Sequence, residues 1–173
     1  MAAKRKDNRL WILVAMLAGV AVIVTGAVVF QQWWNQRPGT NPEEVALTAK
    51  VAGSETEVLP YQVCKPGEAC SERKPALVKI PAGEKMLLDI HPEVADHDWS
   101  LLRIYDDPAA NSEDYFTANQ ESSIEIEPTK QVGGDKKETA RLVVVEVQSL
   151  LIGRDSNNEE TPVQVVWSIE VGH

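Results

Sequence analysis

The feature that most constrains this chain is an uncharged apolar run of 21 residues from Leu10 to Phe30. At about 1.5 Å per residue, a helix of this length is roughly 31 Å long, enough to cross a hydrocarbon core of about 30 Å. A soluble helix this long would carry a polar stripe, whereas only Thr25 interrupts the run. The sequence therefore predicts a transmembrane helix at residues 10–30.

The charges that flank the run predict its orientation. Residues 1–9 form a basic stub that contains Lys4, Arg5, Lys6 and Arg9. On the other side only Arg37 precedes the first acidic residues. Because basic loops stay in the cytoplasm, we expect a single-pass protein of the cell membrane with a cytoplasmic N-terminus and an extracytoplasmic C-terminal domain.

Tryptophans stand at both ends of the run, Trp11 at one and Trp33 and Trp34 at the other. Indole rings favour the membrane interface, so these three residues are expected to contact lipid there. The alternative is a cleaved signal peptide, whose apolar stretch is about 7 to 15 residues long. The nearest cleavage-like site, Thr25-Gly26-Ala27, lies inside the run, which favours an uncleaved signal anchor.

The chain after the anchor divides into a linker and an acidic domain. Residues 31–42 are the expected linker, since NQRPGTNP at 35–42 is rich in proline, glycine and asparagine. Residues 1–30 have a net charge of +3, so the other 143 residues carry −12 of the total of −9. Such a surface repels phosphate backbones and argues against a nucleic-acid partner.

The expected domain, residues 43–173, alternates apolar and polar residues with a period of two. The expected strands lie at 45–51 and 59–63 (a hairpin), 77–80, 86–90, 99–105, 124–126, 141–152 and 163–171. The polar stretches 107–121 and 128–139 are expected to be loops. The pattern predicts a mainly β protein, an antiparallel immunoglobulin-like β-sandwich, with a closed barrel as the alternative.

The two cysteines, Cys64 and Cys70, enclose a Pro-Gly turn and are expected to form a disulfide outside the membrane. Their C-x5-C spacing matches neither a disulfide-exchange nor a zinc motif. A copper or redox site would also need Met86 or a histidine, and we expect neither a metal nor another cofactor.

Asp96-His97-Asp98-Trp99 is the one stretch that suggests a binding site, because a histidine between carboxylates can be oriented or held charged. The alternative is a hydrogen-bonded turn that delivers Trp99 into the core, and it is favoured because neighbours in an extended chain point to opposite faces. No G-x-S-x-G or Walker motif is present, so no catalytic residues are expected and an enzyme is not predicted. Acidic clusters, such as Asp106-Asp107, are expected to be a solvated face or a docking surface for a basic partner.

Five stretches carry a resemblance to a known family: FQQWWNQRPG, PYQVCKPGEAC, ADHDWSLLRIYDDPAAN, RLVVVEVQSLLIG and EETPVQVVWSIEV. The chain resembles a family of actinobacterial membrane-anchored proteins known only as a domain of unknown function. The resemblance implies one N-terminal transmembrane helix and an extracytoplasmic β domain, but no activity. A looser similarity is to the small accessory subunits of the actinobacterial cytochrome bcc-aa3 supercomplex.

These observations lead to one main functional hypothesis and two alternatives. The main hypothesis is a non-catalytic envelope protein whose outer domain binds another envelope component, most simply a protein partner. The first alternative is an accessory subunit of a respiratory supercomplex. The second is an extracytoplasmic copper or redox binding protein.

Overall fold

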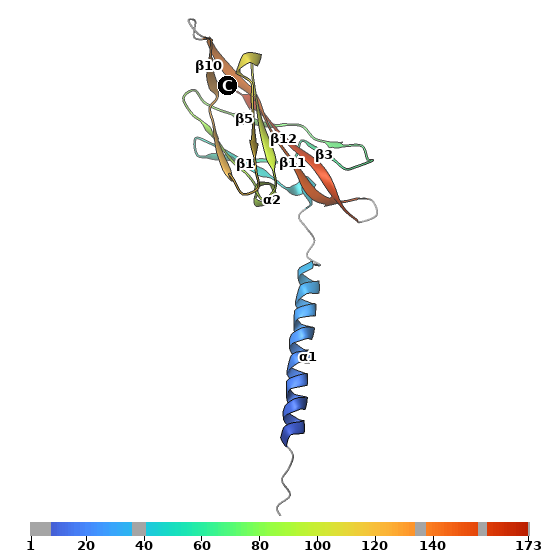
Figure 1. Ribbon diagram of the computed structural model, residues 1–173. Helices are drawn as coiled ribbons and strands as arrows, with labels where there is room; N and C mark the ends of the chain where they lie inside the picture. The colour runs from blue at the N-terminus through green and yellow to red at the C-terminus, as the bar shows by residue number, and fades with distance from the viewer. Residues whose placement is uncertain (1–7, 36–40, 134–137, 156–158, 173) are drawn as a thin grey trace, which may run out of the picture. The chain divides into compact units, whose positions relative to one another are not determined.

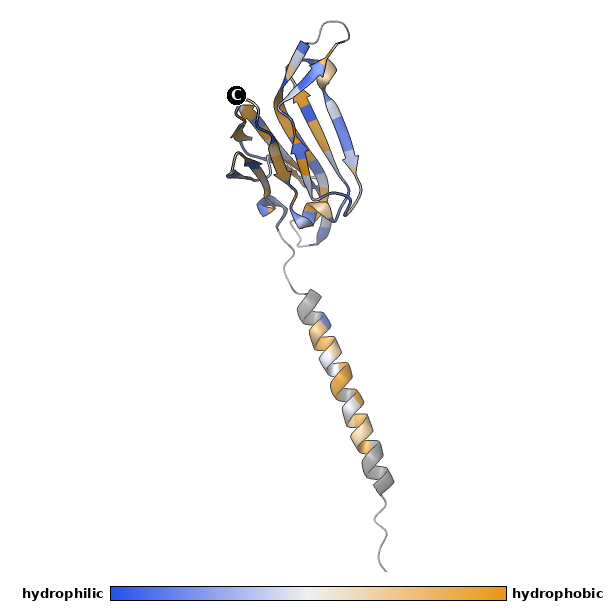
Figure 2. Cartoon of the chain, turned by 90° about the vertical axis from the view of Figure 1, so that its left-hand side faces the viewer, coloured by the Kyte–Doolittle hydropathy of each residue, from blue (hydrophilic) through white to orange (hydrophobic). Residues whose placement is uncertain are grey.

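The computed structural model describes residues 8–35, 41–133, 138–155 and 159–172, which form two compact units, residues 1–38 and 39–173 (Figure 1). The first unit contains one helix, α1 (Asn8–Asn35). Its window Val14–Gln31 has a mean hydropathy of 2.2, and none of the side chains described there is buried, as expected for a membrane anchor or a signal sequence. Figure 2 shows the predominantly apolar colouring of the described helix.

Helix α1 is longer than the apolar run, and this corrects the predicted linker boundary. Residues 31–35 were assigned to the linker but continue the helix, because no proline or glycine occurs between Gly26 and Pro38. The side chains of Trp11, Trp33 and Trp34 lie outside the described residues, so their placement at the membrane interface stays a prediction.

The second unit is built from two sheets. The smaller sheet has the order β2-β1-β6-β9 and is antiparallel throughout. Its strands are β1 (Leu47–Val51), β2 (Ser54–Val58), β6 (Met86–Asp89) and β9 (Ser123–Ile126).

The larger sheet has the order β4-β3-β12-β11-β7-β8. Its strands are β3 (Gln62–Cys64), β4 (Ser71–Glu72), β7 (Trp99–Tyr105), β8 (Ser112–Phe116), β11 (Glu138–Arg154) and β12 (Glu160–Gly172). Two short strands extend its central pair: β5 (Ala76–Lys79) runs parallel to β12, and β10 (Thr129–Val132) pairs antiparallel with β11. Short helical turns occur at η1 (Pro42–Glu44), α2 (Pro92–Ala95) and η2 (Pro108–Ala110).

This architecture confirms the prediction of a mainly β domain with antiparallel sheets, while the immunoglobulin-like class stays a prediction. The predicted hairpin partner was wrong: β1 turns directly into β2, and β3 pairs with β12 in the other sheet. Ala52 and Gly53 both have positive φ, 48° and 83°, which suits a two-residue hairpin turn. The hairpin therefore closes before the expected second strand begins.

Two segments predicted to be loops contain strands, β8 and β10. Both lack an apolar stripe. On β8, the position facing Leu101 is Asp114, which pairs with Arg103 of the neighbouring strand β7. On β10, each of the first three residues is polar and exposed, so periodicity could not reveal the strand.

The two sheets share one hydrophobic core. Leu47, Met86, Leu88 and Ile126 from the smaller sheet are fully buried with Leu101, Leu142, Leu151, Trp167 and Ile169 from the larger one. The Trp167 indole Nε1 donates a buried hydrogen bond of 2.7 Å to the carbonyl oxygen of Val45, just before β1. Trp99 is 3% exposed and its ring stacks on Phe116, with centroids 4.2 Å apart.

The central strand β11 carries apolar side chains on both faces, but only its inner face is buried. Its register shifts between Leu142 and Val144, which leaves Val143 exposed. Beyond the shift, Leu150 and Ile152 lie on the outer face and are 59% and 55% exposed. The outer face of the larger sheet therefore presents apolar side chains to solvent.

We predict that Trp167→Phe destabilises the protein more than Trp99→Phe, although both changes remove the same volume. Trp167→Phe deprives the buried Val45 carbonyl of its donor, a loss worth about 1 to 3 kcal/mol. Within the described structure the Trp99 Nε1 has no hydrogen-bond partner to lose. Urea unfolding of the full chain in mild detergent measures both; equal losses would contradict the role of this hydrogen bond.

Candidate functional site

A groove that carries exposed apolar groups lies on the outer face of the larger sheet. It crosses β8, β7 and β11, where Tyr115 faces Ser100 and Ser100 faces Gln148. Leu150 and its partner Gln164 on β12 lie one pleat further along. The groove has a volume of about 550 Å³, within the usual range of ligand sites.

Tyr115 lines the groove and is 73% exposed. A hydrogen bond between its hydroxyl and the Glu113 carboxylate raises the pKa of Tyr115. Glu113 is two residues earlier on β8, so both side chains lie on the same face of the strand. Ser100, small and nearly buried, lies in the same row.

The predicted stretch Asp96-His97-Asp98 lies beside one end of the groove, but its side chains do not converge. His97 Nδ1 lies 2.6 Å from Asp96 Oδ1 and 2.9 Å from the Glu93 carbonyl oxygen, so it can donate to either. Asp98 instead accepts a hydrogen bond of 3.0 Å from the Ala118 amide. The binding role of these residues stays a prediction, and their contacts describe a structural turn.

The same turn is hydrogen-bonded to the segment after β8 and to β11. The Asn119 amide donates to the Ala95 carbonyl oxygen at 2.6 Å, and Ser149 Oγ donates to the Asp98 carbonyl oxygen at 3.0 Å. His91 Nδ1 accepts from the Glu93 amide and caps the start of α2. These bonds hold the end of the groove formed by Asp98 and Thr117.

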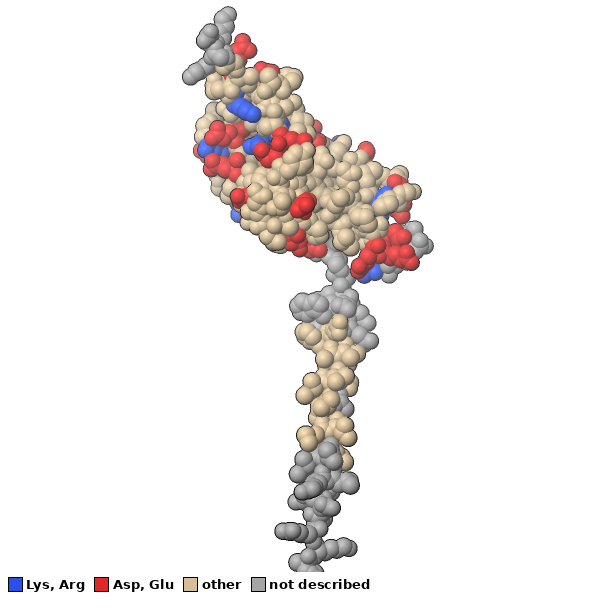
Figure 3. Space-filling model, in the orientation of Figure 1, with Lys and Arg blue, Asp and Glu red and all other residues tan. Residues whose placement is uncertain are grey.

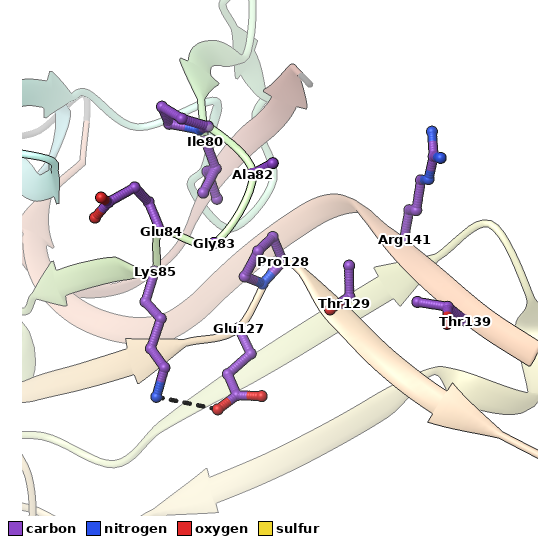
Figure 4. A pocket seen from close by; sticks show the side chains of 11 residues that line it. Ile80, Ala82, Gly83, Glu84, Lys85, Glu127, Pro128, Thr129, Thr139 and Arg141 are labelled. Carbon is purple, nitrogen blue, oxygen red and sulfur yellow. Dashed lines mark ion pairs between the residues drawn. The ribbon is translucent and has the colours of Figure 1, made fainter. Parts of the chain in front are cut away.

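A second cleft, of about 570 Å³, lies between the β5–β6 turn and the Pro128 corner where β9 leads into β10 (Figure 4). Lys85 Nζ lies 2.6 Å from a Glu125 oxygen and 3.1 Å from a Glu127 oxygen, and these carboxylates raise the pKa of Lys85. Figure 4 shows Lys85 and Glu127 pointing toward each other and away from Arg141. The ion pairs of Lys85 therefore join the β5–β6 turn to β9. They do not converge on one point in the cleft.

The outer face of the smaller sheet carries a polar chain across all four strands. Lys50 on β1 lies 3.4 Å from Glu55 on β2 and 2.9 Å from Asp89 on β6, and Ser123 on β9 donates to Asp89 at 2.7 Å. The hydrogen bonds to Asp89 and then Glu55 raise the pKa of Lys50. Those from Lys50 and Ser123 lower the pKa of Asp89. Each group has its partner within the sheet, which indicates a structural role.

Cys64 and Cys70 lie at disulfide distance, with their Sγ atoms 2.05 Å and their Cα atoms 4.2 Å apart. Gly67 between them has a φ of 77°, a conformation that glycine adopts at little cost. Met86, the other sulfur considered for a copper site, is fully buried in the core. In the described ranges no three His, Cys, Asp or Glu side chains are grouped to hold a metal, and His173 falls outside those ranges.

The comparison with family models matches residues 40–172 to the family described as protein of unknown function, DUF2771. The chain belongs to the DUF2771 family. The match covers the whole described β domain and none of α1, so it confirms the predicted resemblance to a domain of unknown function for that part of the chain. The comparison with curated proteins finds no match. The function of this DUF2771 domain therefore has to be argued from its geometry.

Sequence reasoning missed the groove of this DUF2771 domain because the residues that form it come from four strands distant in sequence. Tyr115 falls in the segment 107–121 that was expected to be a loop, and the expected strand at 141–152 left open which way Leu150 points. The available signal was the adjacent pair Tyr115-Phe116 in a polar segment, since aromatic residues favour strands and one of two neighbours must face outward.

We predict that Asp89→Asn makes the free energy of unfolding of this DUF2771 protein depend less on pH in the acid range. The folded-state pKa of Asp89 lies below its unfolded value, so its contribution is present above about pH 4 and is lost as the pH falls through the folded pKa. The difference in stability between the parent and the variant should therefore shrink as the pH falls through this range. Urea midpoints from pH 7 to pH 2 measure it, with Glu57→Gln on β2 as the exposed control. A difference that stays constant with pH would contradict the assignment.

For the disulfide, we predict that the unreduced chain has a mass two hydrogens below that of the reduced chain and that no thiol reacts with an alkylating reagent. Replacing both cysteines by serine should cost on the order of 2 kcal/mol, because the closed loop is short, and should leave the circular dichroism spectrum unchanged. Alkylation of either cysteine without prior reduction would show that the bridge is absent.

Proposed function

We propose that this DUF2771 protein is a non-catalytic, single-pass membrane protein. Its N-terminus lies in the cytoplasm, and its outer immunoglobulin-like β domain binds another component of the cell envelope. The observation that carries the proposal is the outer-face groove, with Tyr115 and Leu150 exposed on a sheet whose other face is packed into the core. Exposed apolar groups gathered around a concave surface are typical of binding sites.

Two properties of α1 support the anchor. Every side chain described between Val14 and Gln31 is exposed within its own unit, although the segment is strongly apolar. Such a helix is stable only in contact with lipid or another apolar surface. The basic residues precede it, which favours a cytoplasmic N-terminus.

The lining of the groove supports binding over catalysis. Within the described lining, the one ionisable side chain besides Tyr115 is Asp98, and its Oδ1 already accepts the Ala118 amide. Acid–base or nucleophilic chemistry needs a poised group with a partner at hydrogen-bond distance. The lining offers amides, hydroxyls and apolar surface, which position a ligand without reacting with it.

The topology is tested with reporters fused after His173 in the full chain. We expect alkaline phosphatase, which is active only outside the cytoplasm, to be active in this position and to lose activity when residues 1–35 are deleted. The intact mass of the membrane-extracted protein should show a chain that begins at or near Met1. A soluble fragment that begins near residue 28 would show a cleaved signal sequence and overturn the anchor.

The binding face is tested with a matched pair of substitutions in the full chain. Leu150→Glu places a charge in the groove, whereas Leu87→Glu places one on the outer face of the smaller sheet. We expect the first variant alone to lose co-purification with a detergent-solubilised envelope fraction, while both keep the parent melting temperature. Equal retention of both variants would contradict binding through the groove.

A further inference from the structure

We propose that the groove takes a neutral, hydroxyl-rich ligand, a stretch of saccharide chain packed against Tyr115 and hydrogen-bonded by the side chains beside it. The inference rests on the proposed function, because it assigns a ligand class to the same groove. It is carried by the exposure of the Tyr115 ring, the chemistry of the lining and the lack of a cation among the lining residues that the structure describes.

The ring of Tyr115 provides a flat apolar platform. It belongs to the groove lining on β8 and is 73% exposed. The face of an aromatic ring carries partial negative charge and attracts the slightly positive C–H groups that line one side of a sugar ring. Leu150, across the groove, adds a second apolar surface.

The polar groups beside the platform match sugar hydroxyls. A hydroxyl donates and accepts hydrogen bonds, and so does the amide of glutamine. In the described structure, the side-chain amides of Gln148 and Gln164 have no hydrogen-bond partner and both line the groove. Ser100 adds a small hydroxyl in the same row as Tyr115 and Gln148.

The charges of the groove disfavour anionic ligands. Of the lining residues that the structure describes, none is Lys, Arg or His, so a phosphate, sulfate or carboxylate would find no counter-charge. The single carboxylate of the described lining, Asp98, has one oxygen engaged by the Ala118 amide, and the lining holds no cluster of carboxylates that would select a cation. A neutral ligand loses less hydration free energy than a charged ligand when it enters the groove.

The backbone of the groove is also preorganised for its ligand. Its strands, β7, β11 and β12, are the centre of the larger sheet, and their other face is packed in the core. A site held in its bound geometry loses little entropy on binding. Trp99 also contributes to the lining and stacks on Phe116.

The test uses the full chain in a zwitterionic detergent, because detergents with sugar headgroups would compete for the groove. The probes are maltohexaose, cellohexaose, chitohexaose and mannohexaose, with an acidic alginate hexamer as the charged comparison. We expect at least one neutral hexasaccharide to bind with a Kd of about 1 mM or tighter, measured by calorimetry. The alginate hexamer should bind at least about tenfold more weakly, a difference of about 1.4 kcal/mol.

Substitutions test whether the ligand binds in the groove. Tyr115→Ala should weaken binding by about tenfold or more, Tyr115→Phe by less than about threefold, and Leu87→Ala not at all. Because Tyr115 is largely exposed, its variants should keep the parent melting temperature. Gln148→Ala should lower the affinity without changing the fold.

The outcomes separate this inference from the proposed function. If no neutral hexasaccharide binds, or alginate binds best, the ligand class is wrong. Should Leu150→Glu still abolish retention of the envelope fraction in that case, the groove remains the binding site and its ligand is a protein segment. If neither saccharide nor envelope fraction depends on the groove, both proposals fail.

Discussion

The buried hydrogen bond from the Trp167 indole to the Val45 carbonyl joins the two sheets at the point where the chain enters β1. A polar group buried at this depth needs a partner, so the bond fixes the larger sheet against the smaller one. Side chains alternate along a strand, and the strands that bury Leu151 and Trp167 therefore turn Leu150 and Gln164 outward. The position of the groove is thus a consequence of how the core is closed.

The ion pairs of the described domain lie outside the groove lining. The Lys50–Asp89 chain lies on the smaller sheet, and Lys85 clasps the β5–β6 turn to β9. Arg103 and Asp114 pair at the edge strand β8, where a charged pair among the inward positions discourages edge-to-edge association. Acidic groups also gather at the end of the β11–β12 hairpin, as Figure 3 shows for the face in view. An acidic surface around a groove with little charge of its own keeps the domain soluble and favours neutral or basic partners.

The parts of the fold that could be predicted are those whose burial leaves a pattern in the sequence. The apolar run of α1, the alternation in β12 and the Cys64–Cys70 spacing each reflect one local requirement. Strands β2, β8 and β10 were missed because edge and surface strands have no apolar stripe, and tertiary pairing decides them. The groove was missed for a related reason: whether Leu150 is buried or exposed depends on the register shift in β11, which a single sequence does not reveal.

Hydroxyl-radical footprinting of the full chain in its native membranes tests the central claim, that the outer face of the larger sheet is the binding face. In the detergent-purified protein Tyr115, Leu150 and Leu87 are all exposed and should all be oxidised. In native membranes we expect Tyr115 and Leu150 to be protected about tenfold relative to the purified protein, while Leu87 on the smaller sheet stays reactive. Equal oxidation of Tyr115 in both preparations, with Leu87 unchanged, would show that nothing covers the groove and would contradict the account.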